Sequence, residues 1–222
     1  MARRGDRLRE HILWVAKDVF LEMGFERASM DVVASRAETS KRSLYAHFES
    51  KQKLFLAVID LVRGLFLSRL QMPGDYSRDP EQALVMFCGR YLESLLYDNS
   101  IRMIRVSTAE TEKFPEQAAQ YFDVLFTQAH ARLSAYLETT FSLSAPASAE
   151  AAHRLLGQIL YPRFPRALFG LDPLAQRLED DTLAPDFDLG QIRQAVAALI
   201  ESLGPCEAPF DTRTGSGYTR HD

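Results

Sequence analysis

The stretch between Ser40 and Phe48 combines hydroxyl, cationic and aromatic side chains in a pattern that points to a specific chemistry. If the stretch is helical, Leu44 and Phe48 lie four residues apart and share one face. The opposite face then carries Lys41, Arg42, Ser43, Tyr45 and His47. Packing explains the apolar face but not the polar one. Cations can bind phosphates and short polar side chains can bind base edges, so the pattern favours a helix that enters the DNA major groove.

The residues around this stretch predict the elements that must position it. Val32, Val33 and Ala37 give a short preceding helix its apolar face, and residues 38–40 break that pattern. Ser40 is a good N-cap for the next helix. Two short helices joined by a tight turn form a helix-turn-helix, so we interpret the chain as a DNA-binding protein.

The charge distribution agrees with contact to DNA at one end of the chain only. Residues 1–53 hold 11 Lys/Arg and 8 Asp/Glu, whereas the remaining 169 residues hold 15 and 22. The formal net charge of −4 therefore conceals a basic N-terminal segment joined to an acidic body. This asymmetry is expected when only the N-terminal segment meets phosphate, although ordinary surface charge would also produce a modest excess.

Several other classes of protein are disfavoured. The chain lacks the His-Glu-x-x-His, P-loop, G-x-G-x-x-G and nucleophile-elbow motifs, so we predict that it is not an enzyme and needs no cofactor. Two cysteines, Cys88 and Cys206, are too few for a disulfide framework, and the five histidines have no metal-ligand spacing. No apolar run approaches the roughly 18 residues of a membrane span, and no signal peptide begins the chain. A cytoplasmic location follows as the expectation.

The rest of the chain predicts an all-α fold with roughly nine helices. Residues 8–23 have helical apolar spacing, and Gly24 is placed to end that helix in a left-handed conformation. Ser50 caps a long helix to about Leu70, whose apolar residues all round predict that it bridges two domains. Asp79-Pro80 starts a helix that ends near Tyr97. Further helices are expected at about 98–113, 115–141, 148–160 and 189–203, the last capped by Asp188 with Gln191. We expect a DNA-binding domain at 1–53, a body at 54–204 and a disordered tail at 205–222.

The N-terminal pattern resembles the TetR family of bacterial transcriptional regulators over about 50 residues. The matching positions have the spacing of that family and are Ile12-Leu13, Phe20, Gly24-Phe25, Ser29-Met30, Ala34, Ser40-Lys41, Leu44-Tyr45, His47-Phe48, Ser50-Lys51 and Leu54-Phe55. A second, shorter similarity links the body to the AefR-like branch through Ile104-Arg105-Val106, Ala109-Glu110 and Phe114-Pro115-Glu116.

The resemblance implies a homodimer with a three-helix DNA-binding head and a helical ligand-binding body. It assigns base reading on a palindromic double-stranded operator to Lys41, Arg42 and Ser43. It implies further DNA contacts, to phosphate or sugar or at the helix entries, by Ser29, Met30, Ser40, Tyr45, His47 and Lys51. Arg3, Arg4 and Arg7 would form a flexible arm. The family usually has Gly where this chain has Glu38, which can adopt that geometry only with strain, so either the turn is altered or Glu38 points outward.

The body offers candidates for an effector site, although an aromatic stripe at helical spacing is also typical of plain core. The candidates are Phe87, Tyr91, Met103, Arg105, Phe122, Phe126, His130 and Phe164, with Tyr161 and Phe169 as further aromatic residues. Arg105 and His130 are the polar members that could orient a ligand. The composition favours a small hydrophobic effector.

Three functional interpretations follow from the sequence. The leading one is a ligand-responsive regulator, a repressor that dimerises through the helices at about 148–160 and 189–203. The apolar stripe of the last helix suits either this interface or docking onto its own body. The alternatives are a DNA-binding architectural protein without an effector, and an enzyme, for which no motif speaks.

Overall fold

The computed structural model describes residues 4–179 and 182–203, and it is all-α as predicted. The chain is 77% helical and forms no strand within the described residues. The described part of the chain holds eleven helices when α8, the π-turn and α9 are counted as one, and nine of the eleven have seven or more residues. Among the described residues, no helix combines the length and apolar character needed to cross a membrane.

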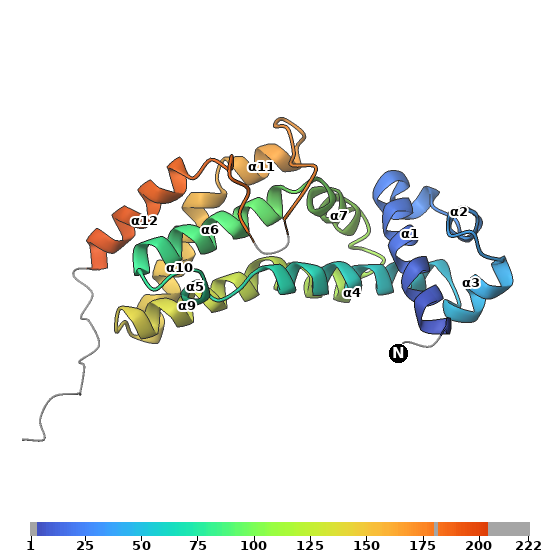
Figure 1. Cartoon of the computed structure of the whole chain (residues 1–222), viewed down its shortest axis with the longest axis horizontal. Coiled ribbons are helices and arrows are strands. Elements are labelled where there is room, and N and C mark those ends of the chain that lie inside the picture. Colours follow the sequence, from blue (N-terminus) through green and yellow to red (C-terminus); the bar gives the residue numbers. More distant parts are fainter. Residues whose placement is uncertain (1–3, 180–181, 204–222) are drawn as a thin grey trace, which may run out of the picture.

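Three helices form a head at one end of the molecule (Figure 1). They are α1 (Arg4–Arg27), α2 (Met30–Arg36) and α3 (Lys41–His47). The long helix α4 (Lys51–Arg69) leaves the head and runs along the body (Figure 1). Helix α1 packs against both α4 and α7, so the head is joined to the body by two separate contacts.

The body is a bundle of helices arranged along α4. Its segments are α5 (Pro73–Tyr76), α6 (Pro80–Leu96), α7 (Asp98–Ala109), α8 (Pro115–Phe122), the π-turn η1 (Asp123–Thr127), α9 (Gln128–Thr140), α10 (Ala145–Leu160), α11 (Arg163–Leu168) and α12 (Gly190–Leu203). Helix α6 is buried along most of its length and packs against α5, α7, α10, α11 and α12. The body is therefore built around α6.

The predicted helix starts are confirmed where a side chain caps the backbone. The side-chain oxygens of Ser40, Ser50 and Asp79 accept hydrogen bonds from the backbone N–H groups of Ser43, Lys53 and Gln82, at 3.0, 3.1 and 2.8 Å. Each bond satisfies one of the donors that a helix N-terminus leaves unpaired.

Other boundaries differ from the predictions. The expected helix at 115–141 is interrupted by the π-turn, where Gln128 N–H bonds to the carbonyl of Asp123. Residues 73–76, which lie between two predicted helices, form the short helix α5, and α10 begins at Ala145 because Pro146 fits its first turn. At α12, Asp188 accepts a hydrogen bond from Gly190 N–H, but the Gln191 amide donates to the carbonyls of Gln158 and Tyr161.

Two predictions for the first helix are also modified. Helix α1 begins at Arg4, so Arg4 and Arg7 belong to a helix and not to a flexible arm. Gly24 has the expected positive φ of 72°, but its ψ of 172° kinks α1 instead of ending it. Arg3 and the tail at 205–222 lie outside the described residues.

A cluster of aromatic rings joins the head to the body. Phe25 of α1 lies 4.9 Å from Phe55 of α4 and 5.2 Å from Phe114, which directly precedes α8, measured between ring centroids. Phe20 lies 5.1 Å from Phe55 in an edge-to-face arrangement. Lys113 extends the contact through an ion pair with Glu26. Each such ring pair adds about 0.5–1.5 kcal/mol of stabilisation beyond the contribution of its buried area. These pairs therefore hold the head against the body.

A buried ion pair on α6 holds the backbone of Glu179, Thr182 and Ala184 against this helix. Arg90 and Glu93 are 1% and 2% exposed, and Arg90 Nη1 lies 2.8 Å from Glu93 Oε2. The Arg90 guanidinium also donates to the carbonyls of Glu179 and Thr182, while Glu93 Oε1 accepts from Ala184 N–H at 2.9 Å. Both charges therefore have hydrogen-bond partners on the segment that covers them, as buried charges require.

We expect Arg90→Met to lower the free energy of unfolding by about 3–5 kcal/mol, because it leaves the Glu93 carboxylate buried without its counter-charge. Urea unfolding followed by circular dichroism measures this change. The double variant Arg90→Met/Glu93→Met removes both charges and should recover much of the loss. A double variant as unstable as the single one would show that packing, and not charge pairing, dominates here.

Candidate nucleic-acid interface and ligand cavity

The turn between α2 and α3 keeps tight geometry despite Glu38. Glu38 N–H bonds to the Ser35 carbonyl at 3.2 Å and Thr39 N–H to the Ala34 carbonyl at 3.0 Å. This pair of bonds is the Schellman motif, which places the residue after the cap in the left-handed region. Glu38 occupies that position with φ 49° and is exposed. The turn is therefore strained rather than altered, and the carboxylate points outward.

The outer face of α3 is exposed and largely unengaged. Arg42 and Tyr45 are exposed, and neither has a hydrogen-bond or ion-pair partner within the described part of the chain. Lys41 Nζ lies 2.8 Å from Asp31 Oδ2, but both side chains are more than 60% exposed. An exposed pair of this kind contributes about 0–1 kcal/mol, so Lys41 can exchange its partner for a phosphate at little cost. Leu44 and Phe48 are buried beneath this face, as the spacing predicted.

Other residues predicted to contact DNA have partners within the head. Ser29 and Ser40 cap α2 and α3 with their hydroxyl groups, and the Ser40 Oγ lies 2.9 Å from the Ser43 Oγ. The Met30 side chain is buried in the head, so only its backbone can reach a partner. His47 is half-buried at the end of α3 and faces the start of α1 near Gly5.

Lys51, for which a phosphate or sugar contact was predicted, is hydrogen-bonded within the chain itself. Its ammonium donates to the carbonyls of Phe25, Glu26 and Ala28 at 2.9, 3.1 and 3.1 Å. It also lies 4.4 Å from the centroid of the Phe25 ring, a cation–π distance. An ammonium has three N–H donors, and all three are used here. Lys51 therefore joins the start of α4 to the end of α1.

A cavity of about 480 Å³ lies in the body between the π-turn region and α10. Four of the eight predicted ligand-binding residues line it, namely Tyr91, Phe122, Phe126 and His130. The Phe122 and Phe126 rings lie 4.9 Å apart. The Tyr91 hydroxyl is buried and has no hydrogen-bond partner within the described residues, and burial raises the pKa of Tyr91, so the phenol keeps its proton. The volume is within the usual range of small-molecule sites.

Five lining residues of this cavity were not predicted. They are Thr127, His153, Leu156, Gly157 and Leu160. Four come from one face of α10, which the sequence presents only as an ordinary amphipathic stripe. The His130 and His153 rings lie 5.5 Å apart, and His130 Nε2 lies 2.9 Å from the Ala149 carbonyl. Because the accepting group is a carbonyl, this nitrogen carries the proton.

The other four predicted ligand-binding residues lie away from this cavity lining. Phe87 and Met103 are fully buried in the core. The Arg105 guanidinium donates to the carbonyls of Ala167 and Leu168, both at 2.9 Å, and so satisfies the end of α11. Phe164 does not line the cavity, but its ring packs edge-to-face against that of Phe126, with 5.8 Å between the centroids.

Helices α10 and α12, the predicted dimer helices, pack against each other. The apolar stripe of α12, at Ile192, Val196 and Leu199, is buried in the chain's own core, so it serves for docking onto the body. A shallow groove along the outside of the two helices is lined by polar and small residues, among them Gln158, Gln194 and Ala198. The exposed rings of Tyr161 and Phe169 lie at either end of α11.

Two family matches cover the head and the body. Residues 12–58 match the family described as "Bacterial regulatory proteins, tetR family", and residues 82–186 match "AefR-like transcriptional repressor, C-terminal domain".

The curated relatives include an activator and a repressor. The "HTH-type transcriptional activator FasR" of Mycolicibacterium smegmatis is 34% identical over 124 residues, which are 53% of this chain and 56% of that protein. The "HTH-type transcriptional repressor NicS" of Pseudomonas putida is 32% identical over 102 residues, which are 46% and 45% of the two chains. The chain therefore spans about half the length of these curated relatives.

Solved structures share the fold over nearly the whole chain. The "Flavonoid-responsive Regulator FrrA" has a TM-score of 0.65 at 25% identity and covers 89% of this chain and 95% of that one. A TetR-family transcriptional regulator from Mesorhizobium loti also has a TM-score of 0.65, at 19% identity, and covers 91% and 97%. The second likeness shows the fold alone.

We expect Glu38→Gly to raise the free energy of unfolding by about 1 kcal/mol, because glycine adopts the left-handed conformation without the Cβ clash. Urea unfolding measures the gain. Glu38→Ala is the matched control, since it removes the charge but keeps the Cβ, and it should give no comparable gain. Equal gains from both substitutions would assign the effect to the carboxylate and not to the backbone.

Proposed function

This chain belongs to the TetR family of bacterial regulatory proteins, and we propose from that premise that it is a homodimeric repressor released from a palindromic operator by a small hydrophobic molecule. That it is a DNA-binding transcriptional regulator follows from the family, and the prediction that it is not an enzyme is thereby confirmed. Repression, the effector and the dimer are the proposed parts.

The exposed outer face of α3 carries the proposal for DNA recognition. Arg42 and Tyr45 extend from a short helix whose other side is fixed in the head by Leu44 and Phe48. A rigidly held helix with an unengaged guanidinium suits bidentate hydrogen bonding to a guanine edge. Lys41 beside it supplies charge for the phosphate backbone. We assign base contact to Arg42 and Ser43, and backbone contact to Lys41 and Tyr45.

The cavity lined by Tyr91, Phe122, Phe126 and His130 supports a hydrophobic effector. The rings of Tyr91, Phe122 and Phe126 line it together with Leu156 and Leu160, and the Tyr91 hydroxyl and His130 are polar groups that could fix a ligand's orientation. A flavonoid is a suitable first probe, because the structurally similar FrrA is described as flavonoid-responsive.

A dimer through the outside of α10 and α12 would carry two heads on one operator. Recognition helices must lie about 34–36 Å apart to reach successive major grooves. The head is seated on α4 and α7, and the cavity walls are α6, the π-turn region and α10. A ligand that moves these walls can therefore tilt the heads and break the spacing.

We expect Arg42→Ala to weaken operator binding by about 1–3 kcal/mol while affecting random DNA much less, because a bidentate base contact is lost. Fluorescence anisotropy with labelled duplexes measures both affinities, once footprinting has identified the operator.

The control is Arg78→Ala, which removes the same charge from an exposed position between α5 and α6 in the body. It should leave operator binding within about 0.5 kcal/mol. An equal loss on operator and random DNA would show that Arg42 contacts phosphate. Binding without preference for any palindrome would favour an architectural protein instead.

For the effector, we expect the flavonoid naringenin to lower operator affinity, and Phe122→Ala to raise the concentration required by about 3–10-fold through the loss of a ring contact. Titration of the preformed protein–DNA complex gives this concentration. Phe169→Ala is the control, because Phe122 and Phe169 are both exposed, at 60% and 80%, but only Phe122 lines the cavity. If naringenin and other hydrophobic aromatic molecules leave the complex intact, the effector proposal fails.

A further inference from the structure

The aromatic cavity beside α10 is closed at one end and open at the other. Tyr91 of α6 is fully buried, at 0% exposure, and Leu156 of α10 is also buried. Phe122 is 60% exposed, and Thr127 and Gly157 are exposed as well. The cavity therefore has its mouth at Phe122 and its inner end at Tyr91.

The inner end holds a hydrogen-bond donor that has no acceptor. The Tyr91 hydroxyl is buried and has no hydrogen-bond partner within the described residues. Burial raises the pKa of Tyr91, so the hydroxyl keeps its proton at neutral pH. The Tyr91 ring packs edge-to-face against Phe66 of α4, with 6.5 Å between the centroids, which holds the phenol in place. A buried hydroxyl without a partner is unfavourable, so a ligand gains affinity by accepting a hydrogen bond from it.

The other polar side chains of the lining are engaged or lie toward the mouth. His130 donates its Nε2 proton to the Ala149 carbonyl, at 2.9 Å. Thr127 and His153 are exposed. Among the described lining residues, Tyr91 is therefore the donor that defines the inner end.

The lining also restricts the charge of a ligand. No Lys, Arg, Asp or Glu lines the cavity among the described residues. An ionised group that is buried without a partner is costly, so the cavity disfavours a ligand whose inner end is charged. Toward the mouth, the rings of Phe122 and Phe126 lie 4.9 Å apart between centroids, and they suit contact with aryl rings.

We propose that this cavity takes an uncharged aromatic ketone, which enters with its carbonyl group first. The Tyr91 hydroxyl donates to the carbonyl oxygen at the inner end, and the aryl rings lie against Phe122 and Phe126. A carbonyl suits this end better than a hydroxyl, because two facing hydroxyls share one hydrogen bond and leave one O–H unpaired. The inference rests on the effector function proposed above and adds the chemical class and the orientation of the ligand.

Benzophenone and diphenylmethane test this class, because they carry the same two rings and only benzophenone has the carbonyl. Equilibrium dialysis gives a dissociation constant for each compound. In Tyr91→Phe, the preference for benzophenone over diphenylmethane should fall about 5–10-fold relative to the unmodified protein, because the donor is lost and the ring is kept. Diphenylacetate adds a carboxylate to the same two rings and should bind at least about tenfold more weakly than benzophenone.

Two further readouts separate hydrogen bonding from packing. A hydrogen bond to the carbonyl oxygen lowers its infrared stretching frequency, so the band of bound benzophenone should lie at a higher frequency in Tyr91→Phe than in the unmodified protein. The thermal unfolding midpoint of Tyr91→Phe should not fall, because the substitution removes a buried hydroxyl that has no partner. A lower midpoint would show that the hydroxyl is already engaged, and would contradict the proposal.

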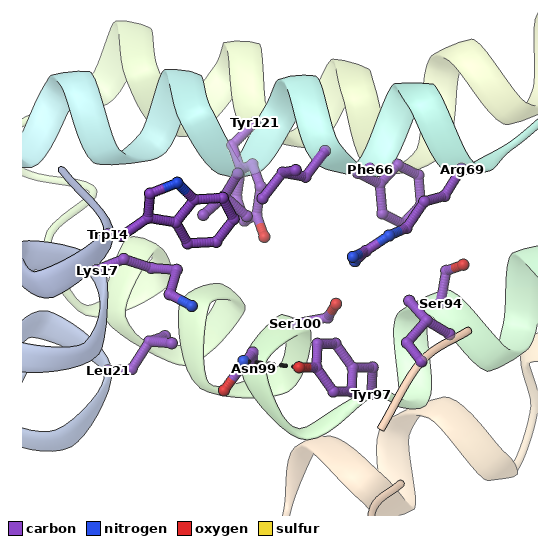
Figure 2. A pocket seen from close by; sticks show the side chains of 13 residues that line it. Trp14, Lys17, Leu21, Phe66, Arg69, Ser94, Tyr97, Asn99, Ser100 and Tyr121 are labelled. Atoms are coloured by element: carbon purple, nitrogen blue, oxygen red, sulfur yellow. Dashed lines mark hydrogen bonds between the residues drawn. The ribbon is translucent and has the colours of Figure 1, made fainter. Parts of the chain in front are cut away.

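The matched control is Tyr121→Phe. Burial also raises the pKa of Tyr121, but this residue lines a separate cavity of about 70 Å³ where the head meets the body (Figure 2). No described residue lines both cavities. The control should therefore change neither the preference for benzophenone nor the position of its carbonyl band.

The possible failures distinguish this inference from the effector proposal. An unchanged preference in Tyr91→Phe, an unchanged carbonyl band, or diphenylacetate binding as tight as that of benzophenone would overturn the ligand class. The effector proposal would survive each of these results if naringenin still weakened the protein–DNA complex. If none of the probes binds and naringenin leaves that complex intact, the effector proposal fails and this inference fails with it.

Discussion

The contact that holds the end of α1 against α4 is centred on one ring, Phe25, and on the Lys51 ammonium group that lies over it. Lys51 uses its three donors on the carbonyls at the end of α1 and places its charge over Phe25, whose other neighbours are Phe55 and Phe114. This arrangement fixes the start of α4 against the end of α1. Helices α2 and α3 lie between α1 and α4 in the sequence. The same contact therefore sets the orientation of the outer face of α3. A displacement of the start of α4 would therefore displace the end of α1 with it.

The walls of the aromatic cavity in the body differ in how firmly they are held. Helix α6 is fixed by the buried Arg90–Glu93 pair and by the segment laid across it, which makes it the least adjustable wall. The opposite walls are less constrained. Phe122 is mostly exposed, and the helix that follows it passes through a π-turn before α9 begins. The fold thus combines a firmly held axis with less constrained walls beside the aromatic cavity.

Local signals predicted local structure well. Hydroxyl or carboxylate caps at Ser40, Ser50 and Asp79 and the four-residue spacing of Leu44 and Phe48 depend on neighbours along the chain, so the sequence contains the information. Hydrogen-bond partners that lie far away in the sequence could not be predicted in this way. Lys51 appeared to be a DNA contact because its carbonyl partners lie more than 20 residues away, and Arg105 appeared to be a ligand contact because α11 lies some 60 residues on. The face of α10 that completes the aromatic cavity showed no special residue types, and Phe87 shows that aromatic character alone does not separate cavity from core.

The π-turn at residues 123–127 also has a consequence for how this chain could diverge. Each α-helical residue turns the chain by about 100°, and a π-turn accommodates one residue more than the α-helical path it replaces. Deleting a single residue there would restore a continuous α-helix and leave α8 and α9 in their present orientation, because the π-turn and the α-turn that replaces it each complete about one turn. Phe122 would then stay in the cavity wall, and the core contacts of α9 would stay in register. One codon gained or lost at this position is therefore a change that the body can absorb without redesigning its core.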